Sequence, residues 1–240
     1  MITMYKRELR ALYLGYRGYT FTAVFAVLYC AVRMVYNYFN IYKTSLGYFN
    51  AEYMLTFLPA AFALAVPVIT FSIFERERKD ESFTFLRSLP LRTRDVLLGK
   101  YFSLLTAFFI PYVLLIVLDL VLGAYSGVAL LTVVLSHISY VLICNAMLSV
   151  SFFCAAFVKN RIVALLISYG VALGYIGFYA LAQLLHVGVW QEMLLRLSVF
   201  GTYTSVILGR FDFASLVLWI SVSAVFLGLS FAAVKKEINE

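Results

Sequence analysis

The chain has 240 residues, 64% of them hydrophobic and 18% aromatic, with a mean hydropathy of +0.94 and a formal net charge of +7. Soluble domains contain roughly 45–50% apolar residues, so the composition excludes an ordinary soluble protein and predicts an all-α polytopic membrane protein. The basic residues lie beside apolar segments, and we therefore assign them to membrane topology and anionic lipid headgroups rather than to nucleic acid.

The first twenty residues are basic and amphipathic, without the cleavage site of a removable signal peptide. Their apolar side chains can share one helix face, with Lys6, Arg7 and Arg10 largely elsewhere. This pattern favours a helix lying in the membrane interface before the chain enters the bilayer. A frayed basic terminus is the alternative. The apolar face consists of Met4, Leu9, Leu12 and Tyr16.

Six later stretches approach the roughly 20 apolar residues that a transmembrane helix needs. Short turns separate some of them: GAYSGV lies between the third and fourth, and VKNR between the fourth and fifth. The predicted spans are residues 19–40, 53–74, 97–122, 129–156, 162–184 and 213–234.

Lys and Arg are unevenly divided between the two sides of these spans. Fifteen of the nineteen fall on the side of the N-terminal segment, the central loop and the C-terminal tail; the other four are Arg33, Lys43, Arg196 and Arg210. Because cytoplasmic loops carry the excess of Lys and Arg, we expect both termini and the central loop in the cytoplasm. An even number of spans agrees with that orientation.

The central segment, residues 74–100, carries too many charges for hydrocarbon and is predicted to face water. Phe83, Leu86 and Leu89 recur at helical spacing, and Pro90 ends this short helix. A second helix is predicted to start near Thr93 and to run into the third span. From these residues alone, a helix that engages a cytoplasmic partner and a charged loop resting on the membrane are equally good interpretations.

Residues 185–212 are too apolar for a solvated loop and too interrupted by Gly, Glu and Arg for a span. We expect short helices that enter the outer leaflet only part-way, packed against protein.

Candidate functional groups inside the spans are few. Asp119 near the end of the third span and Arg33 late in the first form a candidate intramembrane polar site. An interfacial position is the alternative for Asp119, and Arg33 can extend to the headgroups. His137 and His186 have no carboxylate at helical spacing, which argues against a metal site or a proton relay. The three cysteines show no paired spacing and are read as apolar packing residues.

The run from Phe74 to Tyr101, FERERKDESFTFLRSLPLRTRDVLLGKY, resembles the central cytoplasmic loop of type 2 ABC exporter permeases. In that family a charged helix end precedes a short coupling helix, a Leu-rich stretch, a Pro, a basic or hydroxyl pair and a terminal Gly-Lys. This chain differs in having Glu81-Ser82 where the family often has Gly-Thr, and Thr84 in place of an acidic residue. The matching positions are Glu77, Arg78, Lys79, Leu86, Ser88, Pro90, Arg92, Gly99 and Lys100.

The six-span layout, the N-terminal helix and the apolar outer segment are also similar to this family. Residues 205–231 are similar to its gliding-motility and nitrous-oxide-accessory branch. The resemblance implies a single permease domain over residues 1–240, in a bacterial plasma (inner) membrane. It also implies a homo- or heterodimer with a second permease subunit, in which each subunit is driven by one of two cytoplasmic ATPase subunits.

The resemblance further implies which residues contact the ATPase. An apolar set would insert into a groove on that partner, flanked by charged side chains. This coupling site comprises Glu75, Glu77, Phe83, Leu86, Arg87, Leu89 and Pro90.

This chain has no P-loop of its own. Its Gly99-Lys100 pair has Arg94 where the motif needs glycine and Tyr101 where it needs Ser or Thr. We therefore expect no bound cofactor and no catalysis here, with ATP held by the partner subunit.

Two other functions remain open. The same fold can drive an extracytoplasmic partner protein mechanically without moving a solute. An intramembrane enzyme is a third possibility, which the lack of a readable nucleophile and base disfavours.

Overall fold

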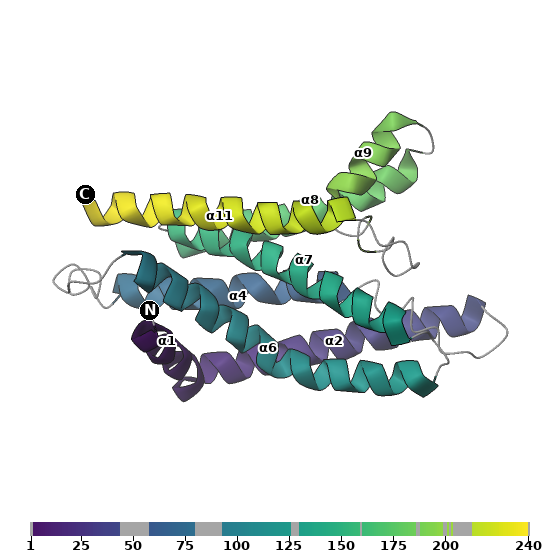
Figure 1. Cartoon of the computed structure of the whole chain (residues 1–240), viewed down its shortest axis with the longest axis horizontal. Helices are drawn as coiled ribbons and strands as arrows, with labels where there is room; N and C mark the ends of the chain where they lie inside the picture. Colours follow the sequence, from purple (N-terminus) through teal and green to yellow (C-terminus); the bar gives the residue numbers. More distant parts are fainter. Residues whose placement is uncertain are drawn as a thin grey trace.

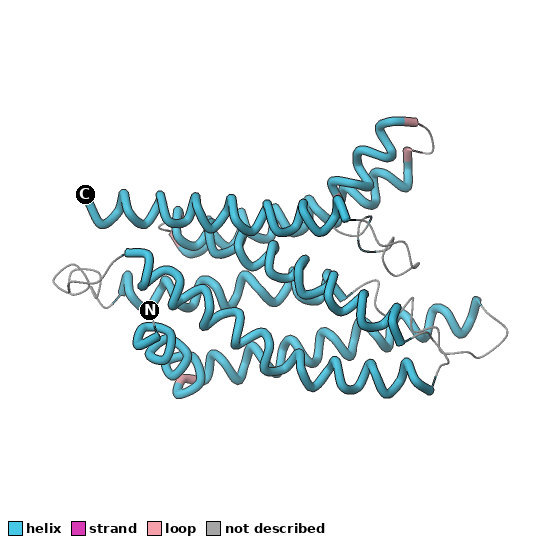
Figure 2. Tube along the Cα trace, in the orientation of Figure 1, coloured by secondary structure: helices cyan, strands magenta, loops and turns pink. Residues whose placement is uncertain are grey.

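The computed structural model describes residues 2–43, 58–79, 93–125, 130–158, 160–185, 188–198, 201, 203 and 213–239. Nearly all of these residues are helical, and this part of the chain contains no strand (Figure 2). The predicted all-α class is therefore confirmed for the described residues.

Eight helices are described. In chain order they are α1 (Ile2–Leu14), α2 (Tyr16–Lys43), α4 (Leu58–Lys79), α6 (Thr93–Tyr125), α7 (Leu130–Phe157), α8 (Arg161–Leu184), α9 (Val189–Leu197) and α11 (Phe213–Asn239).

Four of these helices, α6, α7, α8 and α11, contain stretches long and apolar enough to cross a membrane. They coincide with the last four predicted spans, which makes the chain a membrane protein by helix length and composition. The first two predicted spans overlap α2 and α4, which have 28 and 22 residues. At 1.5 Å per residue the shorter of these extends about 33 Å, close to the thickness of a hydrocarbon core.

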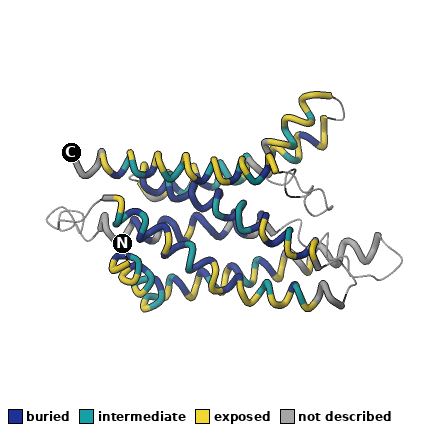
Figure 3. The backbone as a smooth tube through the Cα atoms, viewed as in Figure 1, coloured by how far each residue is buried: buried dark blue, intermediate teal, exposed yellow. Residues whose placement is uncertain are grey.

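The central helix of the molecule is α7, which packs against α4, α6, α8 and α11 (Figure 1). In the most apolar 18-residue stretch of α7, 72% of the residues are buried. In the corresponding stretch of α8, 12% are buried. Figure 3 shows the same contrast, with buried residues along α7 and exposed ones on α8, α9 and α11. A helix that is apolar all round is thus enclosed by its neighbours, whereas α8 presents its apolar side chains outward.

Aromatic rings join the helices of the first half of the chain. The ring centroids of Phe62 in α4 and Phe108 in α6 lie 4.5 Å apart, and Phe25 of α2 lies 6.0 Å and 5.7 Å from them. All three contacts are edge-to-face, the arrangement that the ring quadrupole favours. This triad fixes α2, α4 and α6 against one another.

Both chain termini lie at the same end of the bundle (Figure 1). The last turn of α4 and the first turn of α6, which flank residues 80–92, lie at that end as well. The helix α9 lies at the opposite end, folded back against α8.

Two helix ends are set by the residue types found there. Asn160, within the predicted VKNR turn, caps α8 by accepting a hydrogen bond of 3.0 Å from the Ile162 amide. Gly188 precedes α9 with a φ of +93°, a conformation that side-chain-bearing residues rarely adopt. A glycine at this point lets the chain reverse direction after α8.

Candidate coupling site and intramembrane polar cluster

The two helices that flank the predicted coupling segment, α4 and α6, both pack against α7. Phe74 near the end of α4 and Tyr101 near the start of α6 both contact Phe152 of α7, with ring centroids 5.1 Å and 5.5 Å away. Asp95 occupies the first turn of α6, where a carboxylate is favourable at the helix dipole. The two helices that lead into and out of residues 80–92 are therefore anchored on the same side chain of the central helix.

Residues 74–100 are predicted to face water, but the two residues at the ends of this segment are buried. Phe74 and Lys100 are only 3% and 2% exposed. The start of α6 at Thr93 agrees with the helix start predicted there. The Lys100 ammonium lies 4.7 Å from the centroid of the Phe74 ring. Such a cation–π contact helps to offset the cost of removing the ammonium from water.

The N-terminal helix α1 packs directly on α6 at Gly99. A Cβ atom built on Gly99 would lie 3.0 Å from Met4 Cβ and 3.1 Å from the Tyr5 amide nitrogen, which is closer than ordinary packing allows. A hydrogen bond of 3.0 Å between Tyr5 Oη and Thr106 Oγ1 joins the same two helices. Gly99, the glycine of the Gly-Lys pair that ends the predicted coupling segment, is thus the point where two helix backbones meet.

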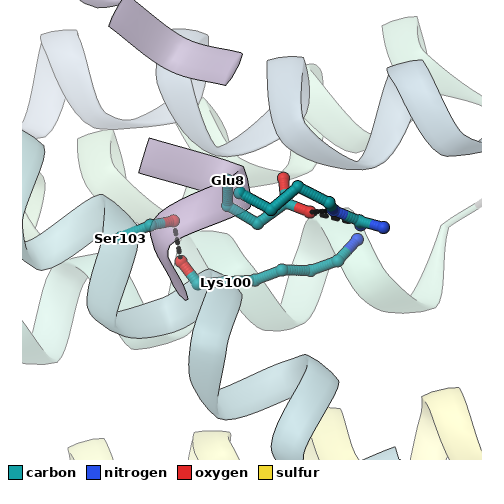
Figure 4. A network of polar contacts seen from close by, with 4 residues as sticks. Glu8, Lys100 and Ser103 are labelled. Carbon is teal, nitrogen blue, oxygen red and sulfur yellow. Dashed lines mark hydrogen bonds and ion pairs between the residues drawn. The ribbon is translucent and has the colours of Figure 1, made fainter. Parts of the chain in front are cut away.

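Polar side chains accompany this contact (Figure 4). Arg7 donates to Glu8 Oε1 at 2.6 Å through Nη2, and Ser103 Oγ donates to the Lys100 carbonyl at 2.7 Å. In Figure 4 the Glu8 and Lys100 side chains extend in the same direction. The inward face of α1 is Met4, Glu8 and Leu12, so α1 brings an acidic group to the interface that buries Lys100.

The inward face of α1 differs from the predicted apolar face. Leu9 is only partly buried, and Tyr16 is 77% exposed. The prediction treated residues 4–16 as one continuous helix, but α1 ends at Leu14 and α2 begins at Tyr16. The break at Gly15 takes Tyr16 out of register with the residues before it.

A polar link across three helices starts at Tyr101, the residue that follows Lys100. Tyr101 Oη donates to Asn145 Oδ1 at 2.8 Å, and Asn145 Nδ2 donates to Ser223 Oγ at 2.9 Å. These residues belong to α6, α7 and α11. Hydrogen bonds between membrane helices are worth about 0.6 kcal/mol on average, up to about 1.7, so the link fixes alignment more than it supplies stability.

A second polar group lies deeper among α2, α6 and α7. Tyr29 donates to Asp119 Oδ2, and His137 Nε2 lies 3.6 Å from the same oxygen. Tyr112 Oη is hydrogen-bonded to His137 Nδ1 at 2.8 Å. None of the four residues as a whole is more than 6% exposed. We refer to Tyr29, Tyr112, Asp119 and His137 as the polar cluster.

The polar cluster adds to one sequence-based expectation and corrects another. Asp119 is 4% exposed and accepts a hydrogen bond from Tyr29 of α2, so it is buried between helices, whereas its depth in the membrane stays a prediction. His137 is not isolated, since its carboxylate neighbour comes from a different helix. Spacing along one helix carries no signal for such a pair, which depends on how α6 and α7 are rotated. The three cysteines are predicted to be apolar packing residues. Cys144 and Cys154 are buried, whereas Cys30 is exposed on the bundle surface.

The remaining predicted site residues are only partly covered by the structure. Glu75 and Glu77 lie in the last turns of α4 and Arg33 lies in α2, but their side chains fall outside the described residues. The rest of the coupling site lies outside the described residues altogether: Phe83, Leu86, Arg87, Leu89 and Pro90. Among the side chains that are described, no three His, Cys, Asp or Glu gather as metal ligands do.

No protein-family model matches the chain, and no curated protein matches it. The roles proposed below for the coupling site and the polar cluster are therefore inferred from the residues and contacts of this chain alone.

Proposed function

We propose that this chain is the transmembrane permease subunit of a type 2 ABC exporter, driven by a separate cytoplasmic ATPase. One observation carries the proposal: the two helices flanking the coupling segment meet on Phe152 of the central helix. A partner that pushes on residues 80–92 would act through α4 and α6 together. The charged, proline-containing sequence of this segment supplies the family resemblance.

The contacts above suggest a route for this movement into the bundle. Displacement of α6 would reach α7 through Tyr101 and Phe152, and α11 through Asn145 and Ser223. Packed side chains and hydrogen bonds of this kind can carry coupling between distant sites. The coupling segment would in this way reorient three membrane helices when ATP is hydrolysed.

The permease is proposed to have six spans, with α2 and α4 as the first two and both termini in the cytoplasm. The fifteen-to-four division of basic residues favours this orientation, and the termini share one end of the bundle with the flanks of residues 80–92. Helix α1 would lie at the cytoplasmic surface and α9 in the outer leaflet. Single cysteines at Ser45 and Val187 should react with an impermeant maleimide in intact cells, and one at Ser82 only after permeabilisation. Reaction of the Ser82 variant in intact cells would disprove this topology.

The proposed function is tested by what accompanies the chain in its own membrane. The tagged chain should co-purify with an ATPase subunit, in a complex of two permease and two ATPase subunits. The complex should hydrolyse ATP, whereas the chain alone should not bind ATP, because its own sequence has no P-loop. Saturable ATP binding by the isolated chain, or purification without any ATPase from native membranes, would contradict the assignment.

Mechanical action on an extracytoplasmic protein is the second candidate. It is favoured by α9, whose large apolar side chains Val189, Trp190 and Met193 are 74%, 72% and 51% exposed at the end opposite the termini. Exposed apolar residues on a helix that leaves the bundle suit a protein partner as well as lipid. ATP hydrolysis that depends on a purified outer protein, without movement of a solute, would select this candidate.

A further inference from the structure

We propose that Asp119 and His137 form one proton-binding site inside the helix bundle, held in place by Tyr29 and Tyr112. This inference goes beyond the transport function and does not depend on it. It concerns a ligand, the proton, that binds within this chain alone.

The geometry makes the two titratable groups a single unit. His137 Nε2 lies 3.6 Å from Asp119 Oδ2, within the range in which opposite charges interact strongly. Tyr29 occupies the same carboxylate oxygen from α2, and Tyr112 fixes the other ring nitrogen of His137. A hydrogen bond to one imidazole nitrogen determines the role of the other, so Tyr112 orients Nε2 toward the carboxylate.

The burial of the polar cluster selects the proton as ligand. The side chains of Asp119 and His137 are 3% and 7% exposed, and Tyr112 and Tyr29 close the site from α6 and α2. A metal ion or an organic cation needs space and further ligands, whereas a proton needs neither. Binding of one proton converts a carboxylate beside a neutral imidazole into a pair without net charge. A pair without net charge is the form that a membrane interior tolerates best.

Among the side chains that the structure describes, the other titratable groups near the site are phenols and a thiol. From α7 come Tyr140, whose ring centroid lies 5.2 Å from that of Tyr112, and Cys144 one turn further on. Tyr203 lies behind them, 6.3 Å from Tyr140 between ring centroids. Such groups are ordinarily neutral near neutral pH. Arg33 lies one turn after Tyr29 on α2, and its side chain falls outside the described residues. An Arg33 variant is therefore included in the experiment below.

The site joins three helices, which gives its occupancy a structural consequence. Asp119 connects α6 to α2 through Tyr29, and His137 connects α6 to α7 through Tyr112. Uptake or loss of the proton changes the charge at the point where these helices meet. The charge state of the pair therefore biases how α2 packs against α6 and α7.

The test is an NMR titration of the full-length chain in lipid nanodiscs, with its imidazole nitrogens labelled by ¹⁵N-histidine. The chain has two histidines, and His186→Gln leaves His137 as the one observed. We expect its ring signals to pass through one transition between about pH 4 and pH 9. Asp119→Asn keeps the shape of the side chain and should displace the midpoint by about 1–3 pH units.

Matched variants make the result specific. Asp95→Asn, the same substitution in the first turn of α6, should leave the midpoint unchanged. Tyr29→Phe removes the hydrogen-bond donor to Asp119 Oδ2 and should move the midpoint of the His137 transition. This variant replaces Asp119→Asn in the test if Asp119→Asn does not fold. In the Arg33→Gln background, Asp119→Asn should still displace the midpoint of the His137 transition. A His137 signal that does not titrate, or whose midpoint is the same with and without the Asp119 carboxylate, would overturn the proposal. Because no ATPase is present, neither result bears on the transport function.

Discussion

Replacing both Phe83 and Leu86 by alanine is expected to release the proposed ATPase partner while the chain remains inserted and folded. Burial of an apolar side chain of this size contributes about 1.5–3 kcal/mol, so the double variant should lose several kcal/mol of contact energy. Exposed ion pairs contribute only about 0–1 kcal/mol each, and the charged flanks Glu75, Glu77 and Arg87 cannot compensate. Co-purification of the ATPase from native membranes measures the loss directly.

The matched control for this variant changes charges instead of apolar side chains. Arg92→Gln with Arg94→Gln should reduce ATPase binding much less, because on our proposal these residues set topology and contact headgroups. Arg94 is exposed, and its guanidinium lies 5.2 Å from the centroid of the Phe231 ring in α11. If the arginine variant lost the ATPase and the alanine variant kept it, residues 83–89 would be a loop resting on the membrane.

Substitution of Gly99 by leucine should displace α1 from α6. Even the first carbon of the new side chain would lie 3.1 Å from the Tyr5 amide nitrogen, and a backbone atom cannot turn aside as a side chain can. Overpacking of this kind costs about 1–3 kcal/mol, and loss of the Tyr5–Thr106 hydrogen bond would add to it. For a chain of this length each kcal/mol lowers the melting temperature by about 2–4 °C. Thermal unfolding in detergent and protease cleavage within α1 measure the two effects.

Gly228→Leu separates this contact from the general effect of removing a helical glycine. Gly228 lies in α11, and a Cβ atom there would have no neighbour within 4 Å. Because glycine is about 1 kcal/mol less favourable than alanine inside a helix, this variant should be neutral or slightly more stable. Destabilisation of the same size by both substitutions would mean that the contact between α1 and α6 is not the cause.

The long helices were predictable because length and apolar content determine them. The predicted spans 129–156, 162–184 and 213–234 begin within one residue of the starts of α7, α8 and α11. The start of α6 at Thr93 was also anticipated, since Thr93 and Asp95 suit the first turn of a helix. The starts of these helices depend on residue types that are close together in the sequence, so the sequence alone was enough to predict them.

The polar cluster and the burial of Lys100 were not predictable in the same way. A carboxylate is recognised as buried or interfacial only when the rotation of its helix is known, and Asp119 meets His137 because α6 and α7 are packed side by side. Lys100 follows charged residues along the chain, yet its position against Phe74 and beneath α1 removes it from water. Both outcomes are set by contacts between helices, to which composition and periodicity along one helix are insensitive.

The uneven burial of the spans determines how freely each can change over evolution. Along α7, where 72% of the apolar window is enclosed, side chains fill a close-packed interior in which one added methylene is felt. Residues there, such as Ala155 at 0% exposure, are held to their size as well as to their polarity. On the outward side of α8 almost any apolar residue meets the requirement, because only 12% of the most apolar stretch of this helix is enclosed. Divergent relatives of this chain should therefore be easier to recognise by the sizes of residues in α7 than by the identity of residues in α8.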